Sequence, residues 1–116
     1  MKHFIIRLVF LILCPAALLH AQPRWQAMPN APVTGGKFDD VFFLNEKMAW
    51  LGGPDENVSK TTDGGISWVP YAVPGIGRIR CVGFADSLNG WAGSLNNGGC
   101  PLYETRNGGL TWNNVN

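Results

Sequence analysis

Histidine is scarce in this sequence, and both copies, His3 and His20, lie near the N-terminus. The first 21 residues have the pattern of a cleaved export signal, described below, so we expect a mature chain without histidine. Nucleophilic systems of the Ser-His-Asp and Cys-His types are then excluded. Two well-separated cysteines remain, which makes a zinc site unexpected. Walker loops and dinucleotide fingerprints are absent, since the glycines of 35–37 and 75–77 are too sparse and predict turns. We therefore expect no cofactor.

An excess of charge of either sign is also lacking. The sequence has nine basic and eight acidic residues, and loss of Lys2 and Arg7 with the export signal leaves seven against eight, a net charge of −1. Such a chain has no basic surface that would attract nucleic acid or an anionic membrane. The partner is then expected to be a protein or a glycan, with no nucleic acid involved.

The N-terminal segment Met1–Ala21 is predicted to be a secretory signal peptide. Lys2 and Arg7 give it a positive start, an apolar stretch follows, and Ala21 is a small residue suited to cleavage. The apolar stretch contains Pro15 and is shorter than the roughly 20 residues of a membrane-spanning helix. We therefore expect a secreted or periplasmic protein with no stable membrane span after cleavage.

The chain contains an internal repeat. Residues 61–68, Thr-Thr-Asp-Gly-Gly-Ile-Ser-Trp, recur 44 residues later as 105–112, Thr-Arg-Asn-Gly-Gly-Leu-Thr-Trp. Upstream, residues 41–52 align with 82–93 at an offset of 41, and the extra length falls in the turn-rich stretch 95–99. A period of this size is typical of propeller blades or other stacked repeats.

Each repeat unit predicts four short strands. Val41 and Phe43 alternate with their neighbours as in a strand, and turn residues such as Gly53-Pro54 separate the apolar runs. No useful window after the N-terminus shows a helical period, so the mature chain is predicted to be all-β. The predicted strands are Asp40–Leu44, Met48–Gly52, Val58–Thr61 and Ile66–Val69 in the first unit, and Arg80–Ala85, Gly90–Ser94, Pro101–Thr105 and Leu110–Val115 in the second.

Turn chemistry explains the repeated octapeptide. Its Gly-Gly pair accepts positive φ without steric cost, which favours a tight hairpin. Asp63 can accept hydrogen bonds from backbone N–H groups of its own turn, and Asn107 can do the same with its amide oxygen. A hydroxyl and an indole ring follow in both copies, and the ring is expected to shield the hairpin from water. These residues are Ser67, Trp68, Thr111 and Trp112.

The octapeptide resembles the Asp-box, or BNR repeat, Ser/Thr-x-Asp-x-Gly-x-Thr-Trp. The matching residues are Thr61, Asp63, Gly65, Ser67, Trp68, Thr105, Gly109, Thr111 and Trp112, with Asn107 in the place of the second Asp. Residues 84–93, Phe-Ala-Asp-Ser-Leu-Asn-Gly-Trp-Ala-Gly, are similar to blades of the photosystem II assembly/stability-factor-like family, whose members are secreted or lumenal β-propellers. The resemblance covers residues 38–116, and it implies that the boxes stabilise turns on the outer rim and do not act as catalysts.

These patterns predict a β-propeller fragment of about two four-stranded antiparallel blades. Residues 38–72 would form the first blade and 78–116 the second, after an N-terminal strand and linker over 22–37 in which Trp25 begins an orphan fourth strand. Propellers usually need about four to eight blades. We therefore expect an incomplete chain, the N-terminal portion of a longer protein or a truncated gene product. The alternative is a short protein that builds its ring from several copies.

Arg78 and Arg80 are the best binding candidates. Their i, i+2 spacing places two cations on one face at the start of a strand, where they could meet an anionic partner. The resemblance implies that this first strand lines the central channel. Asp39 and Asp40 hold the equivalent place in the first blade. The alternative is that the arginines are solvated charges at the end of a loop.

Cys81 and Cys100 are the two cysteines of the expected mature chain. An oxidising compartment allows a disulfide between them. They are predicted on the first and third strands of one unit, about 10 Å apart, which exceeds the reach of a relaxed disulfide. The glycine-containing loop over 97–99 could shorten that gap, so a disulfide and two small apolar fillers both remain open.

The favoured function is an exported, non-catalytic propeller segment that acts as a binding or assembly module. The alternatives are the first part of a sialidase-like glycoside hydrolase whose catalytic residues lie beyond Asn116, or a decayed fragment. Glycoside hydrolysis needs two converging carboxylates. The pairs Asp39-Asp40 and Asp55-Glu56 are adjacent in sequence and face opposite sides of a strand, so neither pair converges on one substrate.

Overall fold

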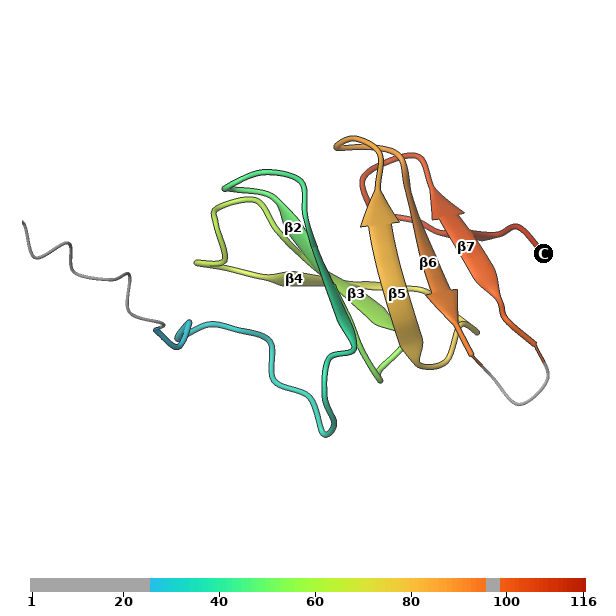
Figure 1. Cartoon of the computed structure of the whole chain (residues 1–116), viewed down its shortest axis with the longest axis horizontal. Helices are drawn as coiled ribbons and strands as arrows, with labels where there is room; N and C mark the ends of the chain where they lie inside the picture. The colour runs from blue at the N-terminus through green and yellow to red at the C-terminus, as the bar shows by residue number, and fades with distance from the viewer. Residues whose placement is uncertain (1–25, 96–98) are drawn as a thin grey trace, which may run out of the picture.

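The chain folds into two separate antiparallel sheets (Figure 1). The computed structural model describes residues 26–95 and 99–116, and these residues form two four-stranded sheets and no helix. The first sheet, blade 1, contains β1 (Asp40–Phe43), β2 (Ala49–Gly52), β3 (Asn57–Thr61) and β4 (Val69–Ala72). The second, blade 2, contains β5 (Ile79–Phe84), β6 (Gly90–Ser94), β7 (Leu102–Thr105) and β8 (Asn113–Asn114). The predicted all-β fold of two four-stranded units is confirmed.

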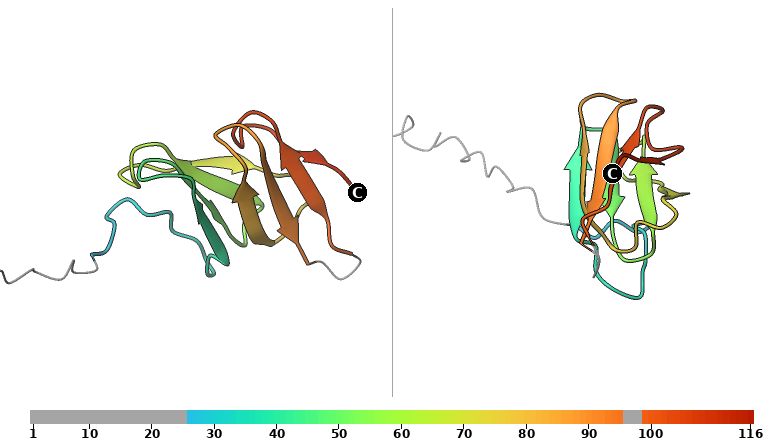
Figure 2. Two further views of the ribbon diagram at one scale, coloured as in Figure 1. Left: turned by 45° about the horizontal axis from the view of Figure 1, so that its top comes forward. Right: turned by 90° about the vertical axis from the view of Figure 1, so that its right-hand side faces the viewer.

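Both blades are meanders in which each strand pairs with the next one along the chain. The blades pack against each other mainly through β5, which contacts β1 and β2. Figure 2 shows blade 2 in front of blade 1 when the molecule is viewed from its C-terminal side. The described residues contain no helix long and apolar enough to cross a membrane.

The fourth strand of each blade begins later than the sequence pattern predicted. β4 begins three residues after Ile66, and β8 begins three residues after Leu110. The turn before each strand extends further than expected, because the N–H of Ser67 donates to Asp63 Oδ1 at 2.9 Å and keeps Ser67 in the turn. The other six strands lie within one residue of their predicted ends.

The expected orphan strand near Trp25 is wrong for the part of it that the structure describes. Residues 26–39 contain turns and bends but no strand, and Trp25 and the predicted signal peptide lie outside the described residues. A strand without a neighbour has no ladder to satisfy its backbone groups. The segment is instead held by side chains: Asn30 Nδ2 donates to the Ile66 carbonyl at 2.8 Å, and Thr34 Oγ1 donates to Asp55 Oδ2 at 2.5 Å.

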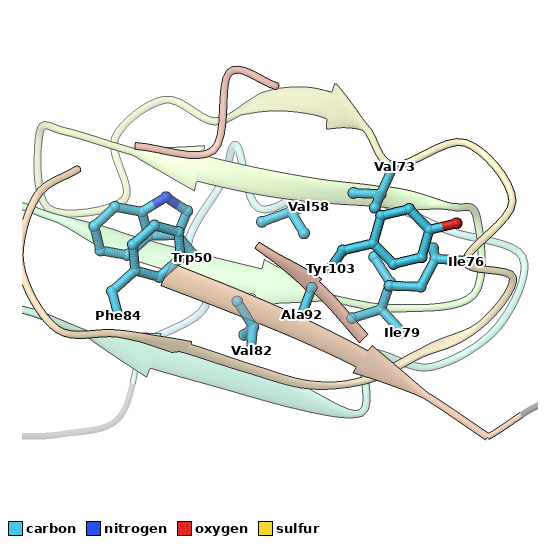
Figure 3. Close-up of a cluster of buried hydrophobic side chains, with 9 residues drawn as sticks. All are labelled: Trp50, Val58, Val73, Ile76, Ile79, Val82, Phe84, Ala92 and Tyr103. Atoms are coloured by element: carbon cyan, nitrogen blue, oxygen red, sulfur yellow. The ribbon is translucent and has the colours of Figure 1, made fainter. Parts of the chain in front are cut away.

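The core lies between the two blades (Figure 3). At one end, the Trp50 ring of β2 stacks on the Phe84 ring of β5, with centroids 3.7 Å apart and planes 11° apart. Trp50 Nε1 also donates to the Gly108 carbonyl of blade 2 at 3.1 Å. The Trp112 and Phe84 rings form a T-shaped pair with centroids 6.0 Å apart. One indole therefore supplies both apolar contact and a hydrogen bond across the interface.

The other end of the core surrounds Tyr103 of β7. Its ring lies beside Val73, Ile76 and Ile79 (Figure 3), and its hydroxyl donates to the Pro74 carbonyl at 3.0 Å. Val73, Pro74 and Ile76 belong to the connection between β4 and β5. The connection between β4 and β5 is thus held in place by Tyr103 of blade 2, the blade to which it leads.

The two equivalent tryptophans provide a test of this core. Trp50→Ala should lower the free energy of unfolding by about 3–5 kcal/mol, because it opens a large cavity between the blades. Trp91→Ala is the matched control. Trp91 holds the corresponding place in blade 2 but is 43% exposed, whereas Trp50 is fully buried. At a chain concentration low enough to keep the protein monomeric, its loss should cost about 1 kcal/mol or less. Urea unfolding followed by circular dichroism measures both, and equal losses would contradict this account of the core.

Candidate functional site

The two octapeptide turns have the same pattern of hydrogen bonds. In blade 1, Thr61 Oγ1 donates to Asp63 Oδ1 at 2.8 Å and accepts the Gly65 N–H at 2.8 Å. In blade 2, Thr105 Oγ1 donates to Asn107 Oδ1 at 3.0 Å and accepts the Gly109 N–H at 2.9 Å. The glycines of both turns have positive φ, between 74° and 92°. Asp63 and Asn107 also accept backbone N–H groups of their own turns, from Ser67 at 2.9 Å and from Thr111 at 3.0 Å.

The exchange of Asp for Asn between the turns reverses one donor and one acceptor. Ser67 Oγ donates to Asp63 Oδ2 at 2.6 Å, whereas Asn107 Nδ2 donates to Thr111 Oγ1 at 2.8 Å. The Ser67 hydroxyl is the main cause that lowers the pKa of Asp63 to about 2. The geometry of the turn is otherwise kept, because the hydroxyl can serve as either donor or acceptor.

The tryptophans that end the octapeptides are equivalently placed. Trp68 Nε1 donates to the Gly65 carbonyl at 3.2 Å, and Trp112 Nε1 donates to the Gly109 carbonyl at 3.0 Å. Each indole folds back over its own turn and is half-buried there. The ten octapeptide residues that the sequence singled out thus bond to their own turns, and the carboxylate of Asp63 is engaged by Thr61 and Ser67.

A cluster of opposite charges joins the blades where β1 and β5 begin. Asp39 accepts hydrogen bonds from Arg78 Nε and from Arg78 Nη2, the latter at 3.0 Å. Arg80 Nη1 lies 3.6 Å from Asp39 Oδ2, and Lys37 Nζ lies 4.0 Å from Asp39 Oδ1. The Arg78 hydrogen bond is the main cause that holds the pKa of Asp39 below its usual range. We call these residues, with Asp40, the interblade charge cluster.

The two arginines differ in how many of their N–H donors remain available to a partner. Arg78 makes a two-pronged contact with Asp39, also donates to the Lys37 carbonyl at 3.3 Å, and is 31% exposed. Arg80 has one long contact and is 45% exposed. Because a guanidinium carries five N–H donors, Arg80 retains donors for a partner, while Arg78 serves mainly to join the blades. The sequence analysis put the arginines and aspartates in equivalent places but did not predict this ion pair, for which their opposite charge was an available signal.

The carboxylates considered for hydrolysis all have structural partners. Asp39 is held by Arg78, and Asp40 Oδ2 accepts the Val82 N–H at 2.9 Å. Asp55 accepts from Thr34, and Glu56 Oε1 accepts the Gly77 N–H at 3.0 Å. Each of these bonds ties a loop or a second blade to blade 1. No group of three or more metal-ligating side chains occurs among the described residues.

Cys81 and Cys100 are both exposed free thiols. Cys81 lies on β5 opposite Gly93 of β6, and Gly93 lies opposite Leu102 of β7. The Cys81 sulfur leans over Gly93, where an added Cβ would approach it to 2.7 Å. The strand β6 therefore lies between Cys81 and the segment that carries Cys100, which precedes β7, and the two cysteines form no disulfide.

The buried threonine of the second octapeptide provides a stability test. Thr105→Val should lower the free energy of unfolding by about 1–3 kcal/mol, because it leaves the Gly109 N–H and Asn107 Oδ1 without their shared partner. Thr105 is only 1% exposed, so water does not replace its hydroxyl. Thr111→Val is the control, since Thr111 is exposed and should cost less. Chemical denaturation at neutral pH measures both losses, and a larger loss for Thr111→Val would refute the assignment.

The depressed pKa of Asp63 predicts acid sensitivity. A carboxyl whose pKa is about 2 in the folded state and 3.8 when unperturbed stabilises the fold above pH 4. That contribution is lost as the pH falls from about 4 to about 2. Asp63→Asn reproduces the blade 2 turn and should reduce the loss of stability between pH 5 and pH 2 while retaining the fold at pH 7. Unfolding midpoints across this range test it, and an unchanged acid response would contradict it.

No protein-family model and no curated protein matches the chain. A solved structure described as "YCF48 bound to D1 peptide" is similar to it, with a TM-score of 0.61 and 24% sequence identity. The match covers 75% of this chain but only 27% of that chain, so this chain spans about a quarter of that protein's length. The likeness supports the fold, and it identifies the two meanders as blades of β-propeller type.

Proposed function

We propose that this chain is an exported, non-catalytic propeller segment that binds a protein partner through the interblade charge cluster. The partner would present an anionic group, such as a carboxylate of an acidic side chain or of a chain end. Arg80 is the residue proposed to contact it. Support for a peptide partner comes from the similar YCF48 structure, which is described as bound to a D1 peptide.

The exposure of Arg80 beside an already paired carboxylate is the observation that supports this proposal most strongly. Three cations, Lys37, Arg78 and Arg80, surround Asp39, whose side chain is only 9% exposed. Arg78 donates to both Asp39 oxygens, so the negative charge of Asp39 is mainly paired with Arg78 and only weakly with Arg80 and Lys37. Lys37 is 78% exposed and Arg80 is 45% exposed. A partner carboxylate would find two accessible donors there, of which the planar Arg80 allows paired hydrogen bonds.

Peptide binding tests this proposal. The probe is a short fluorescent peptide with acidic side chains and a free C-terminal carboxylate, titrated with the chain at low ionic strength. We expect Arg80→Ala to weaken binding about 10-fold or more, as loss of a charge-assisted pair does. Added salt should weaken binding as well, because the contact is exposed.

Two controls distinguish binding at Arg80 from nonspecific electrostatic attraction. Arg106→Ala removes an arginine that pairs with Glu104 at 3.3 Å in blade 2, and it should leave peptide binding unchanged. A probe with amides in place of its carboxylates should bind poorly to the native chain. Equal binding by the native chain and Arg80→Ala would refute the proposed site, and no binding of either probe would refute an anionic partner.

A further inference from the structure

The interface between the blades has two unlike faces. Blade 1 contributes a donor face, on which the indole N–H of Trp50 and the ammonium of Lys60 both point to one carbonyl of blade 2. Blade 2 contributes an acceptor face, formed by Val82, Phe84 and the Gly108 carbonyl. Trp50 is fully buried, and Phe84 is 6% exposed, only because these faces meet.

Blade 2 carries a second donor face on its opposite side. Trp50 lies opposite Lys60 in the register of β2 and β3, and Trp91 lies opposite Glu104 in that of β6 and β7. Leu102 similarly takes the place of Val58. Trp91 is 43% exposed and Leu102 is 39% exposed. No hydrogen-bond partner for the Trp91 indole is found among the described residues.

Blade 1 carries a second acceptor face on its own opposite side. Val41 corresponds to Val82, and Phe43 corresponds to Phe84, with matching register against the next strand. Val41 is 44% exposed and Phe43 is 65% exposed, whereas both blade 2 counterparts are 6% exposed. The Gly64 carbonyl is the counterpart of the Gly108 carbonyl, and within the described residues no hydrogen bond reaches it.

Met28 marks the position on this free face where a tryptophan would dock. An added Cβ on Gly109 would lie 3.3 Å from Nε1 of Trp50, and one on Gly65 would lie 1.9 Å from Cε of Met28. Met28 therefore covers the blade 1 turn where Trp50 covers the blade 2 turn. A thioether has no N–H, so it cannot donate to the Gly64 carbonyl as an indole does. Met28 is itself 44% exposed, and its side chain is flexible enough to move aside.

We propose that a second copy of this chain docks its Trp91 donor face onto the Val41–Phe43 acceptor face of the first. Trp91 of one copy replaces Met28 over Gly65 of the next and donates to the Gly64 carbonyl. The occupant is a second copy because one chain carries both halves of an interface that it already forms once internally. This inference does not depend on the peptide site.

The contact is head-to-tail, so it repeats until a ring closes. Since propellers close with about four to eight blades, a ring would take about two to four copies. The docked interface is weaker than the internal one at several positions. Gly83 takes the place of Phe42, whose ring centroid lies 6.3 Å from that of Phe84, and Cys81 takes the place of Asp40, which accepts the Val82 N–H. Glu104 replaces Lys60, so the Gly64 carbonyl would receive a hydrogen bond from Trp91 alone.

Two variants, one for each face, test the proposal on the full chain. Trp91→Asp removes the donor face, and Phe43→Asp removes the acceptor face. The native chain should form oligomers whose mass increases with concentration, measured by sedimentation equilibrium, whereas each variant alone should remain monomeric. An equimolar mixture of the variants should form a heterodimer that grows no further, because one intact donor face and one intact acceptor face remain. Circular dichroism confirms that each variant is folded.

A control and a conservative variant complete the experiment. Leu110→Asp removes a side chain that is 51% exposed in a turn, and it should associate as the native chain does. Trp91→Phe keeps an apolar ring but lacks the N–H, and it should weaken association about 5- to 10-fold. A native chain that stays monomeric at all concentrations would overturn the proposal. Variants that stay monomeric when mixed would overturn it too, as would a loss of association in Leu110→Asp.

Discussion

The contact of Trp50 with Phe84 and with the Gly108 carbonyl is the interaction on which the rest of the structure depends. A single four-stranded meander has two faces and cannot bury either by itself. Trp50 solves this for one face, because its ring stacks on Phe84 while its N–H satisfies a carbonyl of the facing turn. Lys60 donates to the same carbonyl at 3.0 Å and lies 5.3 Å from the Trp50 ring centre. Burial there lowers the pKa of Lys60. The contact therefore buries one face of each blade.

The octapeptide turns matter to this contact because they orient the carbonyl that receives it. Thr105 and Asn107 fix the turn from inside, so the Gly108 carbonyl faces Trp50 and the Gly109 carbonyl accepts from Trp112. A motif that closes its own hairpin is thus also half of the interface between blades. This explains why blade 1 can carry Asp at this position and blade 2 can carry Asn. Both side chains hold the backbone in place, and neither forms the interface itself.

The interblade charge cluster joins the same two blades at the start of their first strands. Asp39 and Arg78 form the contact that holds β1 near β5, and Asp40 adds a hydrogen bond to the Val82 N–H. Arg80 lies beside this pair and keeps N–H donors available, since its Nη1 is 3.6 Å from Asp39 Oδ2. The functional proposal and the structural role therefore fall on nearby residues at the start of β5. They are separable because Arg78 makes the close two-pronged contact with Asp39, whereas Arg80 makes one long contact with it and is 45% exposed.

Features set by neighbours in the sequence were predictable from the sequence, and features set by distant partners were not. The strand pattern and the hydrogen bonds of Asp63 depend on residues a few positions away, and the repeat is visible by comparing two stretches of the sequence, so composition and spacing were sufficient. Trp50 and Trp91 look alike in sequence, yet one is buried and the other 43% exposed, because only Trp50 has a blade to cover it. The pairing of Arg78 with Asp39 spans 39 positions, and the placement of Met28 over Gly65 replaces an expected strand. Burial and ion pairing need groups brought together in space, so tertiary structure alone decided them.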